Sequence, residues 1–207
     1  MEVVLVRFTD TPEAICAQAM ASCQSTKAAH EIFFQDHDIK RLLTLAIKSG
    51  HESVLEHATF TFSIKGISRA CSHQLVRHRI ASFSQQSQRH VNPTKISDWY
   101  VTPPSTQKED GLWSSQLYAI TMSNLAKLYS EMISKGIPEE DARFILPNAC
   151  KTNITVTMNA RELRHFFKLR LSKSAQWEIR EMANAMLKLC KTVAPIIFGE
   201  FTYEQTK

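Results

Sequence analysis

Two stretches of the chain alternate apolar and polar residues with the two-residue period of a half-buried β-strand. They cover residues 59–65 and 152–158. Their apolar faces consist of Phe60, Phe62 and Ile64 in the first stretch and of Ile154, Val156 and Met158 in the second. A β-branched run at residues 3–8 predicts a further strand, so we expect the chain to build a sheet.

Helical spacing of apolar residues predicts the remaining regular elements. The longer helices are expected at residues 38–49, 67–78, 112–135 and 175–194, with a short one after Pro138. Thr11 is expected to cap another helix through its hydroxyl, ahead of Pro12 in the first turn. Asn159 is expected to cap a further one, with Glu162 three residues on completing a capping box. Residues 82–92 are polar without an apolar period and predict a loop.

Strands and helices are mixed without a βαβ rhythm, which predicts the α+β class. The 207 residues suit one domain of ordinary size, and we expect a single domain over residues 1–207. Hydrophobic residues make up 43% of the chain and charged residues 22%, as in globular proteins generally. These features fix a class of fold but no activity.

The five cysteines are widely spaced and include no C-x-x-C pair, which argues against a disulfide framework and against a zinc knuckle. A reducing cytoplasm fits this pattern. The apolar run near the N-terminus is too short for a signal peptide, and no segment approaches the roughly 18 apolar residues of a membrane span. We therefore expect a cytoplasmic protein with no membrane partner.

Positive charge is concentrated in two stretches of the sequence. The chain carries a formal net charge of +5, yet residues 57–97 contain no Asp or Glu, and Glu162 is the only acid in residues 142–177. Segregated positive charge attracts anions. A solvated basic face is the alternative interpretation of any such run.

The richest basic segment favours a nucleotide over a plain charged surface. It runs Arg77-His78-Arg79, then after seven residues Ser87, and then Arg89. A guanidinium grips phosphate oxygens with a planar fork, and the Ser and Gln side chains of residues 82–88 can hydrogen-bond both phosphate and a polar heterocycle.

This spacing resembles the R-H-R-x7-S motif of flavin-dependent thymidylate synthases. Further stretches resemble that family in the same order along the chain. They are Gly50-His51-Glu52-Ser53 with Glu56-His57, Ala142-Arg143-Phe144-Ile145-Leu146-Pro147, Asn159-Ala160-Arg161, Leu169-Arg170-Leu171, and Ala175-Gln176-Trp177-Glu178-Ile179-Arg180. The resemblance covers roughly residues 1–200. It implies a central, mostly antiparallel sheet flanked by long helices.

The resemblance also implies an activity, namely reductive methylation of deoxyuridine monophosphate (dUMP) to dTMP. FAD would be bound, NADPH would reduce it, and 5,10-methylenetetrahydrofolate would supply the carbon, in a homotetramer with active sites where subunits meet. The implied FAD contacts are Ser53, Arg77, His78, Arg79, Gln85, Asn159, Arg161 and His165. The implied dUMP contacts are Gln74, Arg77, Gln85, Gln86, Ser87, Gln88, Arg89, Arg143 and Arg170. His51 and His90 would lie near the folate or the nicotinamide, and no metal is implied.

Three positions depart from the family pattern. Gln85 stands where many members have Glu, so a neutral amide takes the place of a carboxylate. His90 replaces a frequent Tyr and His165 a frequent Asn, and both histidines can still stack or hydrogen-bond.

Arg170 is the residue expected to act on the substrate ring. A guanidinium against the pyrimidine oxygens stabilises the ring's imide anion and so makes the ring a better nucleophile. A cysteine nucleophile is the other route to thymidylate, but Cys71 has the helical phase of a core residue. Ser87 lacks a G-x-S-x-G turn and is expected to hydrogen-bond, with a plain turn serine as the alternative.

Several residues have plainer interpretations. His51 and His57 are six apart, whereas a zincin helix needs two histidines four apart, so a metal site is not expected. His73 is interpreted as a partly buried histidine, and Phe166 and Trp177 as core anchors. Arg143 alone would be read as a surface charge.

A nucleic-acid-binding protein is the competing hypothesis from a different functional class. The basic stretches would form a phosphate track, with aromatics such as Phe83 stacking on bases. Against it, these stretches contain few aromatics at exposed-looking positions, and Ser and Gln outnumber Lys.

Overall fold

The computed structural model describes residues 1–96, 98–107 and 112–203. The chain divides into two compact units. The first consists of residues 1–64, 74–84 and 155–207, and the second of residues 65–73 and 85–154. The prediction of a single domain stays a prediction, and each unit is treated separately below.

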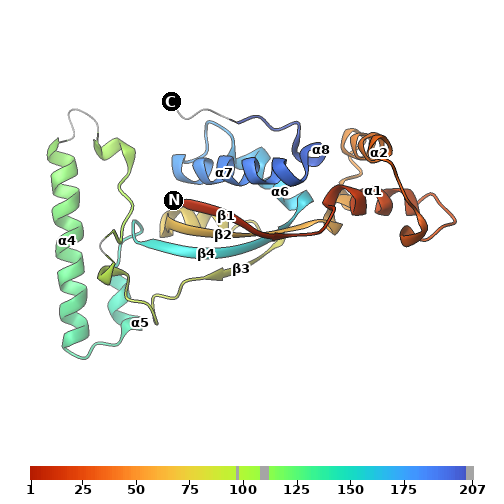
Figure 1. Cartoon of the computed structure of the whole chain (residues 1–207). Helices are drawn as coiled ribbons and strands as arrows, with labels where there is room; N and C mark the ends of the chain where they lie inside the picture. Colours follow the sequence, from red (N-terminus) through yellow and green to blue (C-terminus); the bar gives the residue numbers. More distant parts are fainter. Residues whose placement is uncertain (97, 108–111, 204–207) are drawn as a thin grey trace. The chain divides into compact units, whose positions relative to one another are not determined.

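The described residues form four strands and eight α-helices, joined by short 3-10 turns (Figure 1). The strands are β1 (Glu2–Phe8), β2 (Thr59–Ser68), β3 (Ala81–Gln85) and β4 (Lys151–Asn159). The helices are α1 (Pro12–Ser22), α2 (Asp36–Lys48), α3 (Arg69–Leu75), α4 (Leu112–Ser134), α5 (Glu139–Ala142), α6 (Ala160–Arg170), α7 (Trp177–Val193) and α8 (Pro195–Phe198). The predicted α+β class is confirmed.

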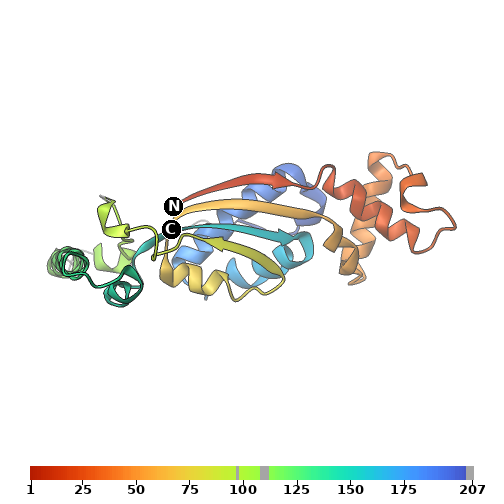
Figure 2. The same cartoon turned by 90° about the horizontal axis from the view of Figure 1, so that it is seen from below.

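The strands lie side by side in the order β1-β2-β4-β3, as Figure 2 shows. Thr61 and Thr157 pair through their hydroxyls at 2.8 Å. The amide of Gly66 donates to Asn153 Oδ1 at 3.1 Å. Because residue numbers rise along β2 while those of their partners fall along β4, these two strands are antiparallel.

The alternating pattern of β2 has the predicted effect on burial. Phe60, Phe62 and Ile64 are fully buried, while the polar residues between them are exposed or half-buried. Phe60 meets Phe198 of α8 edge-to-face, with ring centroids 5.6 Å apart. α6 and α7 pack on each other, and α7 also contacts β1, so these helices cover the apolar side (Figure 1).

The second unit has its own smaller core. Trp99, Met122 of α4 and Cys150 are buried together. Tyr118 packs against this cluster and donates its hydroxyl to the carbonyl of Val101 at 2.9 Å. The long helix α4 therefore uses one side to close the core of the second unit.

Two predicted elements differ from the structure. Residues 82–92 are not wholly a loop, because Ala81–Gln85 form β3 at the edge of the sheet. Main-chain hydrogen bonds to β4 hold this strand, so it needs no apolar alternation of its own. The helix expected over residues 67–78 is shorter, since Ile67 and Ser68 still belong to β2.

The predicted cap of α1 is also wrong in its chemistry. Thr11 precedes the helix, but its side chain makes no capping hydrogen bond. Its backbone is left-handed, with φ of 44°, an uncommon conformation for a β-branched residue. The carbonyl of Thr11 instead accepts from the amides of Ala14 and Ile15, so the turn is closed by the main chain.

No helix within the described part of the chain combines the length and apolar character that crossing a membrane requires.

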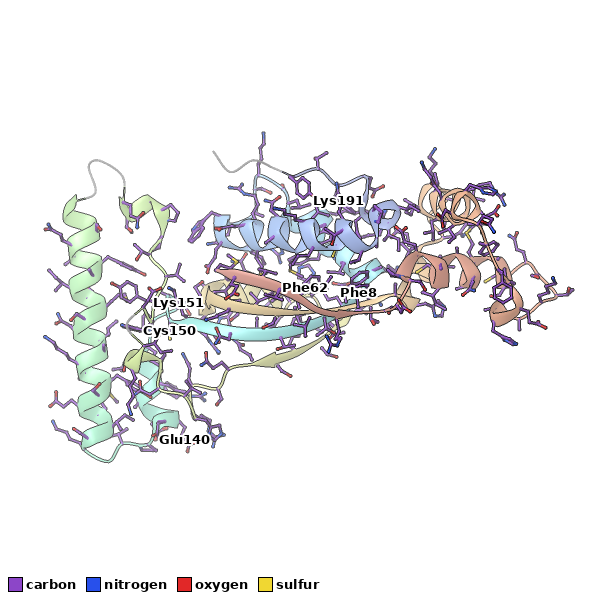
Figure 3. The ribbon with its side chains drawn as sticks, in the orientation of Figure 1. Phe8, Phe62, Glu140, Cys150, Lys151 and Lys191 are labelled. Carbon is purple, nitrogen blue, oxygen red and sulfur yellow. The ribbon has the colours of Figure 1, made fainter. Side chains whose placement is uncertain are left out.

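Phe62 tests whether the β2 face carries the stability of the first unit (Figure 3). We expect Phe62→Ala to lower the free energy of unfolding by about 3–5 kcal/mol, because a fully buried ring is replaced by a cavity. Urea denaturation followed by circular dichroism measures this change. Phe33→Ala is the matched control, since Phe33 is 85% exposed. Equal losses in the two variants would contradict this account of the core.

Candidate active site

The end of β4 and the start of α6 build the first group of candidate residues. Asn159 Oδ1 accepts the amide of Glu162 at 2.8 Å, so the predicted N-cap is confirmed. The predicted capping box is wrong, because the carboxylate of Glu162 contacts His78 and not the amide of Asn159, with Oε1 3.1 Å from Nδ1. Asn159 thus fixes the first turn of α6, and that turn places an acid beside the R-H-R segment.

His78 is buried beside Glu162, with 5% of its surface exposed. Burial lowers the pKa of His78 below its usual value; the hydrogen bond that His78 donates to the Glu162 carboxylate opposes this shift, and the charge of Arg170 adds to it. The ring of Phe166, itself fully buried, meets the imidazole edge-to-face at 5.0 Å. The imidazole is therefore neutral near pH 7.

Arg170, at the end of α6, reaches the other side of the same ring. Its Nε donates to His78 Nε2 at 3.1 Å, and its Nη2 lies 3.5 Å from the carbonyl of Gln74. Glu162, His78 and Arg170 thus form one continuous hydrogen-bonded chain. This contact joins two motifs that are 92 residues apart in the sequence.

A cavity of about 440 Å³ opens beside this chain. Its lining residues are Glu52, Glu56, Ile80, Asn159, Arg161, Glu162, His165 and Lys168. Such a volume falls within the roughly 300–1,000 Å³ typical of small-molecule sites. Three residues that the resemblance assigns to FAD, namely Asn159, Arg161 and His165, therefore share one cavity.

The basic side chains of this cavity have acidic neighbours. Arg161 pairs with Glu56 at 2.5 Å, and Lys168 lies 3.6 Å from Glu52. The acids come from the 3-10 turn Glu52–His57, just before the acid-free stretch. The positive charge seen in the sequence is consequently partly balanced in the fold.

Arg164 is a buried charge that the sequence analysis did not single out. Only 1% of its surface is exposed. Its guanidinium donates to Glu52, to Glu200 at 2.7 Å and to the carbonyl of Ile197 at 2.6 Å. Arg164 occupies a position of α6 that faces the core, and this helical phase could have marked it as buried. A count of basic residues does not show the phase.

The other candidates of the first unit lie at its surface. Arg77, Arg79, Ser53 and His51 are exposed, and none of them lines the 440 Å³ cavity. Gln74 is half-buried.

Two plainer interpretations have different outcomes in the structure. His73 is exposed, so its prediction as a partly buried residue is wrong. Phe166 is a core residue as predicted, while Trp177 is only half-buried.

In the second unit, the candidate glutamines are engaged in the fold. Gln85 Nε2 donates to the hydroxyls of Ser72 and Thr152 at 2.9 and 3.2 Å. Gln88 Nε2 lies 3.5 Å from Cys150 Sγ. Gln86 is half-buried, and its amide bonds the carbonyl of Asn153.

Ser87 Oγ accepts the amide of Arg89 at 3.1 Å, and its carbonyl accepts the amide of Val91. It therefore serves the turn, which is compatible with a further hydrogen bond to a ligand.

The two candidate arginines of the second unit meet at one acid. Arg89 pairs with Glu140 at 2.9 Å, and Arg143 Nε donates to the carbonyl of the same residue at 3.1 Å. Glu140 belongs to α5 and is labelled in Figure 3. Arg89 and Glu140 both remain about half exposed, so an incoming phosphate can compete with the carboxylate for the guanidinium.

His90 lies apart from these arginines on a separate cavity of about 530 Å³ within the second unit. Lys95 and Glu139 also line this cavity. His90 is exposed there, which suits a residue that meets a ligand.

His78, Glu162 and His165 bring three potential metal-ligand atoms within 4.8 Å of one another. Both ring nitrogens of His78 are already engaged, one by Glu162 and one by Arg170. A cation at Nε2 would have to displace the positively charged guanidinium of Arg170, and a cation at Nδ1 would have to replace the proton shared with Glu162. The chemistry of this donor set disfavours a metal.

The cysteines are placed for packing. Cys16, Cys71, Cys150 and Cys190 are fully buried. Burial raises the pKa of the Cys16 thiol to about 12, and it raises the pKa of the Cys150 and Cys190 thiols as well. Cys71 is a core residue, as its helical phase predicted. Because the thiolate is the nucleophile, these buried thiols are poor candidates for covalent catalysis.

Comparison with known proteins places the chain. The family model described as thymidylate synthase complementing protein matches residues 4–196. The chain belongs to this family. The flavin-dependent thymidylate synthase of Geobacter sulfurreducens is 48% identical over 202 residues, covering 97% of this chain and 86% of that protein. The enzyme of the same name from Pyrococcus abyssi is 49% identical over 194 residues, covering 91% and 78%.

A solved structure agrees with this family assignment. The flavin-dependent thymidylate synthase of Helicobacter pylori, complexed with FAD and dUMP, superposes with a TM-score of 0.81 at 26% identity. The match covers 97% of this chain and 99% of that one. The predicted resemblance and the predicted fold are therefore confirmed, and the hypothesis of a nucleic-acid-binding protein receives no support from these thymidylate synthase relatives.

Arg164 tests how much its ion pairs with Glu52 and Glu200 stabilise the protein next to the cavity. We expect Arg164→Met to lower the free energy of unfolding by about 2 kcal/mol, less than the 3–5 of a fully buried pair because Glu52 and Glu200 keep some contact with water. Urea denaturation measures the loss, and Lys188→Met on the exposed side of α7 is the control. A loss no larger than the control's would show that the cluster contributes nothing to stability.

Proposed function

We propose that this chain is an FAD-dependent thymidylate synthase, which methylates dUMP to dTMP reductively. 5,10-Methylenetetrahydrofolate is the carbon donor and NADPH the reductant. Membership of the family supports the reaction class. The observation in the molecule that carries the proposal is the contact of Arg170 with His78, because His78 in turn contacts Glu162, which lines a cavity of ligand size.

The cavity residues fit FAD by their chemistry. Arg161 and Lys168 offer positive charge for a pyrophosphate, Asn159 offers an amide, and Ile80 and His165 offer an apolar and a flat surface. The chemistry that FAD supplies when bound is hydride transfer. We assign the FAD contacts to Arg161, Asn159 and His165 together with Ser53, Arg77, His78, Arg79 and Gln85.

To bind an anion, the guanidinium of Arg161 must break its ion pair with Glu56 or bind both anions at once. This ion pair is half exposed on both sides, so breaking it costs little. In the absence of the ligand, the ion pair with Glu56 orients the Arg161 side chain toward the cavity.

The side chains that we assign to the nucleotide carry guanidinium and amide groups, which bind phosphate oxygens and a polar heterocycle. We assign the phosphate of dUMP to Arg89 and Arg143, because both arginines contact Glu140. Gln86, Ser87 and Gln88 provide neighbouring hydrogen-bonding groups, and Gln74, Gln85 and Arg77 complete the set. Arg170 is assigned to the uracil ring.

The chemical role of Arg170 follows from its charge and its orientation. A guanidinium does not lose its proton near neutral pH, so it stabilises negative charge that develops on the pyrimidine oxygens. The ring carbon becomes a better nucleophile toward the one-carbon unit. His78, neutral and buried, orients this cation without adding a charge of its own.

The remaining components of the reaction are proposed from the family resemblance. NADPH and the folate approach near His51 and His90. The working enzyme is a homotetramer in the cytoplasm, with active sites where subunits meet and no nucleic acid or metal involved.

The visible absorption spectrum of the purified protein tests the proposal directly. We expect yellow protein that releases FAD on denaturation, that NADPH bleaches, and that forms dTMP from dUMP and methylenetetrahydrofolate. Chromatography of the nucleotide products measures the last step. Colourless protein that takes up no flavin, or that binds oligonucleotides with a steep salt dependence, would contradict the proposal.

Arg170 separates catalysis from cofactor binding. We expect Arg170→Ala to reduce dTMP formation to background, because the variant lacks the cation that we assign to the ring anion, while most of the flavin stays bound. Flavin absorbance per protomer and product formation are measured on the same sample. Loss of the flavin together with the activity would assign Arg170 to the cofactor instead.

A further inference from the structure

The hydrogen-bonding chain through His78 has a fixed direction. An arginine is always a donor, so Nε2 of His78 must accept the Arg170 Nε–H across their 3.1 Å contact. A neutral imidazole carries a single proton, and Nδ1 therefore holds it. That proton points to Glu162 Oε1, 3.1 Å away.

Glu162 is the group that selects this tautomer. A carboxylate only accepts hydrogen bonds, so it requires the proton on Nδ1 and leaves the lone pair of Nε2 for Arg170. Without an acceptor at this position, the ring could place its proton on Nε2. Two donors would then face each other, and Arg170 would lose its partner.

The burial of Glu162 calls for an explanation beyond helix capping. Only 7% of its surface is exposed. An acid in the first turn of a helix gains from the helix dipole while fully solvated, so the dipole alone does not require burial. A buried carboxylate needs partners, and within the described part of the chain Glu162 finds one in the imidazole of His78.

We propose that Glu162 is a positioning residue for Arg170, acting through His78: its carboxylate fixes the proton on Nδ1, and the free Nε2 lone pair holds the guanidinium in one orientation. The proposal rests on the proposed function for its catalytic consequence. Its structural part, the tautomer of His78, stands independently of any reaction.

A pH dependence follows from the same arrangement. The titratable groups that face His78 are Glu162, His165 and Arg170, all on α6. When the pH falls through the lowered pKa of His78, Nε2 gains a proton and repels the Arg170 donor. We therefore expect turnover to fall on the acid side. Removing the charge of Glu162 should move this acid limb to lower pH, since Glu162 raises the pKa of His78.

Two substitutions separate the acceptor from the charge. In Glu162→Gln the amide oxygen can still accept the Nδ1–H, so we expect kcat within about threefold of the unmodified enzyme and an acid limb at lower pH. In Glu162→Leu no acceptor remains. We expect kcat to fall about 10- to 100-fold, as for loss of a hydrogen bond that involves a charged group, while flavin content is retained.

Nitrogen NMR of histidine-labelled, flavin-free protein at pH 8 is the readout that does not depend on activity. His78→Asn assigns the resonance. We expect a protonated Nδ1 and an unprotonated Nε2 in the unmodified protein and in Glu162→Gln, and a gain of the Nε2–H form in Glu162→Leu. Glu181→Gln, on the exposed face of α7, is the control for loss of an acid that does not contact His78.

The outcomes are distinguishable. Absence of dTMP formation by the unmodified protein would overturn the proposed function, while the NMR result would still decide on the tautomer. A Glu162→Leu variant with unchanged tautomer and unchanged kcat would overturn the positioning role. If that variant does not fold, Glu162→Gln decides: an acid limb at lower pH supports the role, and an unmoved limb overturns it.

Discussion

A charge that leaves water must find its partner inside the protein, and much of this molecule's first unit is arranged around that requirement. Arg164 is almost fully buried and draws together Glu52, Glu200 and the carbonyl of Ile197. These groups come from a 3-10 turn, the helix α8 and the residues after it. Two residues before Arg164 in α6, Glu162 is buried against His78. The helix α6 thus carries two buried ionic groups, and each contacts a segment near the cavity.

The sequence predicted the sheet well where burial dictates the pattern. β2 and β4 each have one face against a core, so their apolar residues alternate, and Phe60 and Val156 lie where the period places them. β3 escaped notice because an edge strand is held by main-chain hydrogen bonds and its side chains are mostly polar. The predicted capping hydrogen bond of Thr11 failed for a similar reason. Its residue type suits a cap, but its backbone is left-handed and its side chain makes no such bond. Local composition does not record such long-range or conformational constraints.

The candidate site shows the same division. Motif spacing identified His78 and Arg170, but it did not predict the hydrogen bond between their side chains. The acid-poor stretches predicted exposed positive charge, whereas Glu56 and Glu140 pair with Arg161 and Arg89 in the fold. A charge count along the chain misses partners that lie far away in sequence. Glu162 was predicted as half of a capping box, whereas its carboxylate contacts His78, a partner 84 residues away that no local pattern indicates.

The distribution of sulfur has a practical consequence. Four of the five thiols lie in the interior, while Cys23, directly after α1, is exposed. Reduced flavins form peroxide with oxygen, and the four buried thiols are shielded from it. One accessible thiol also offers a point for attaching a single fluorophore or spin label, so the chain's motions can be followed without first replacing its other cysteines.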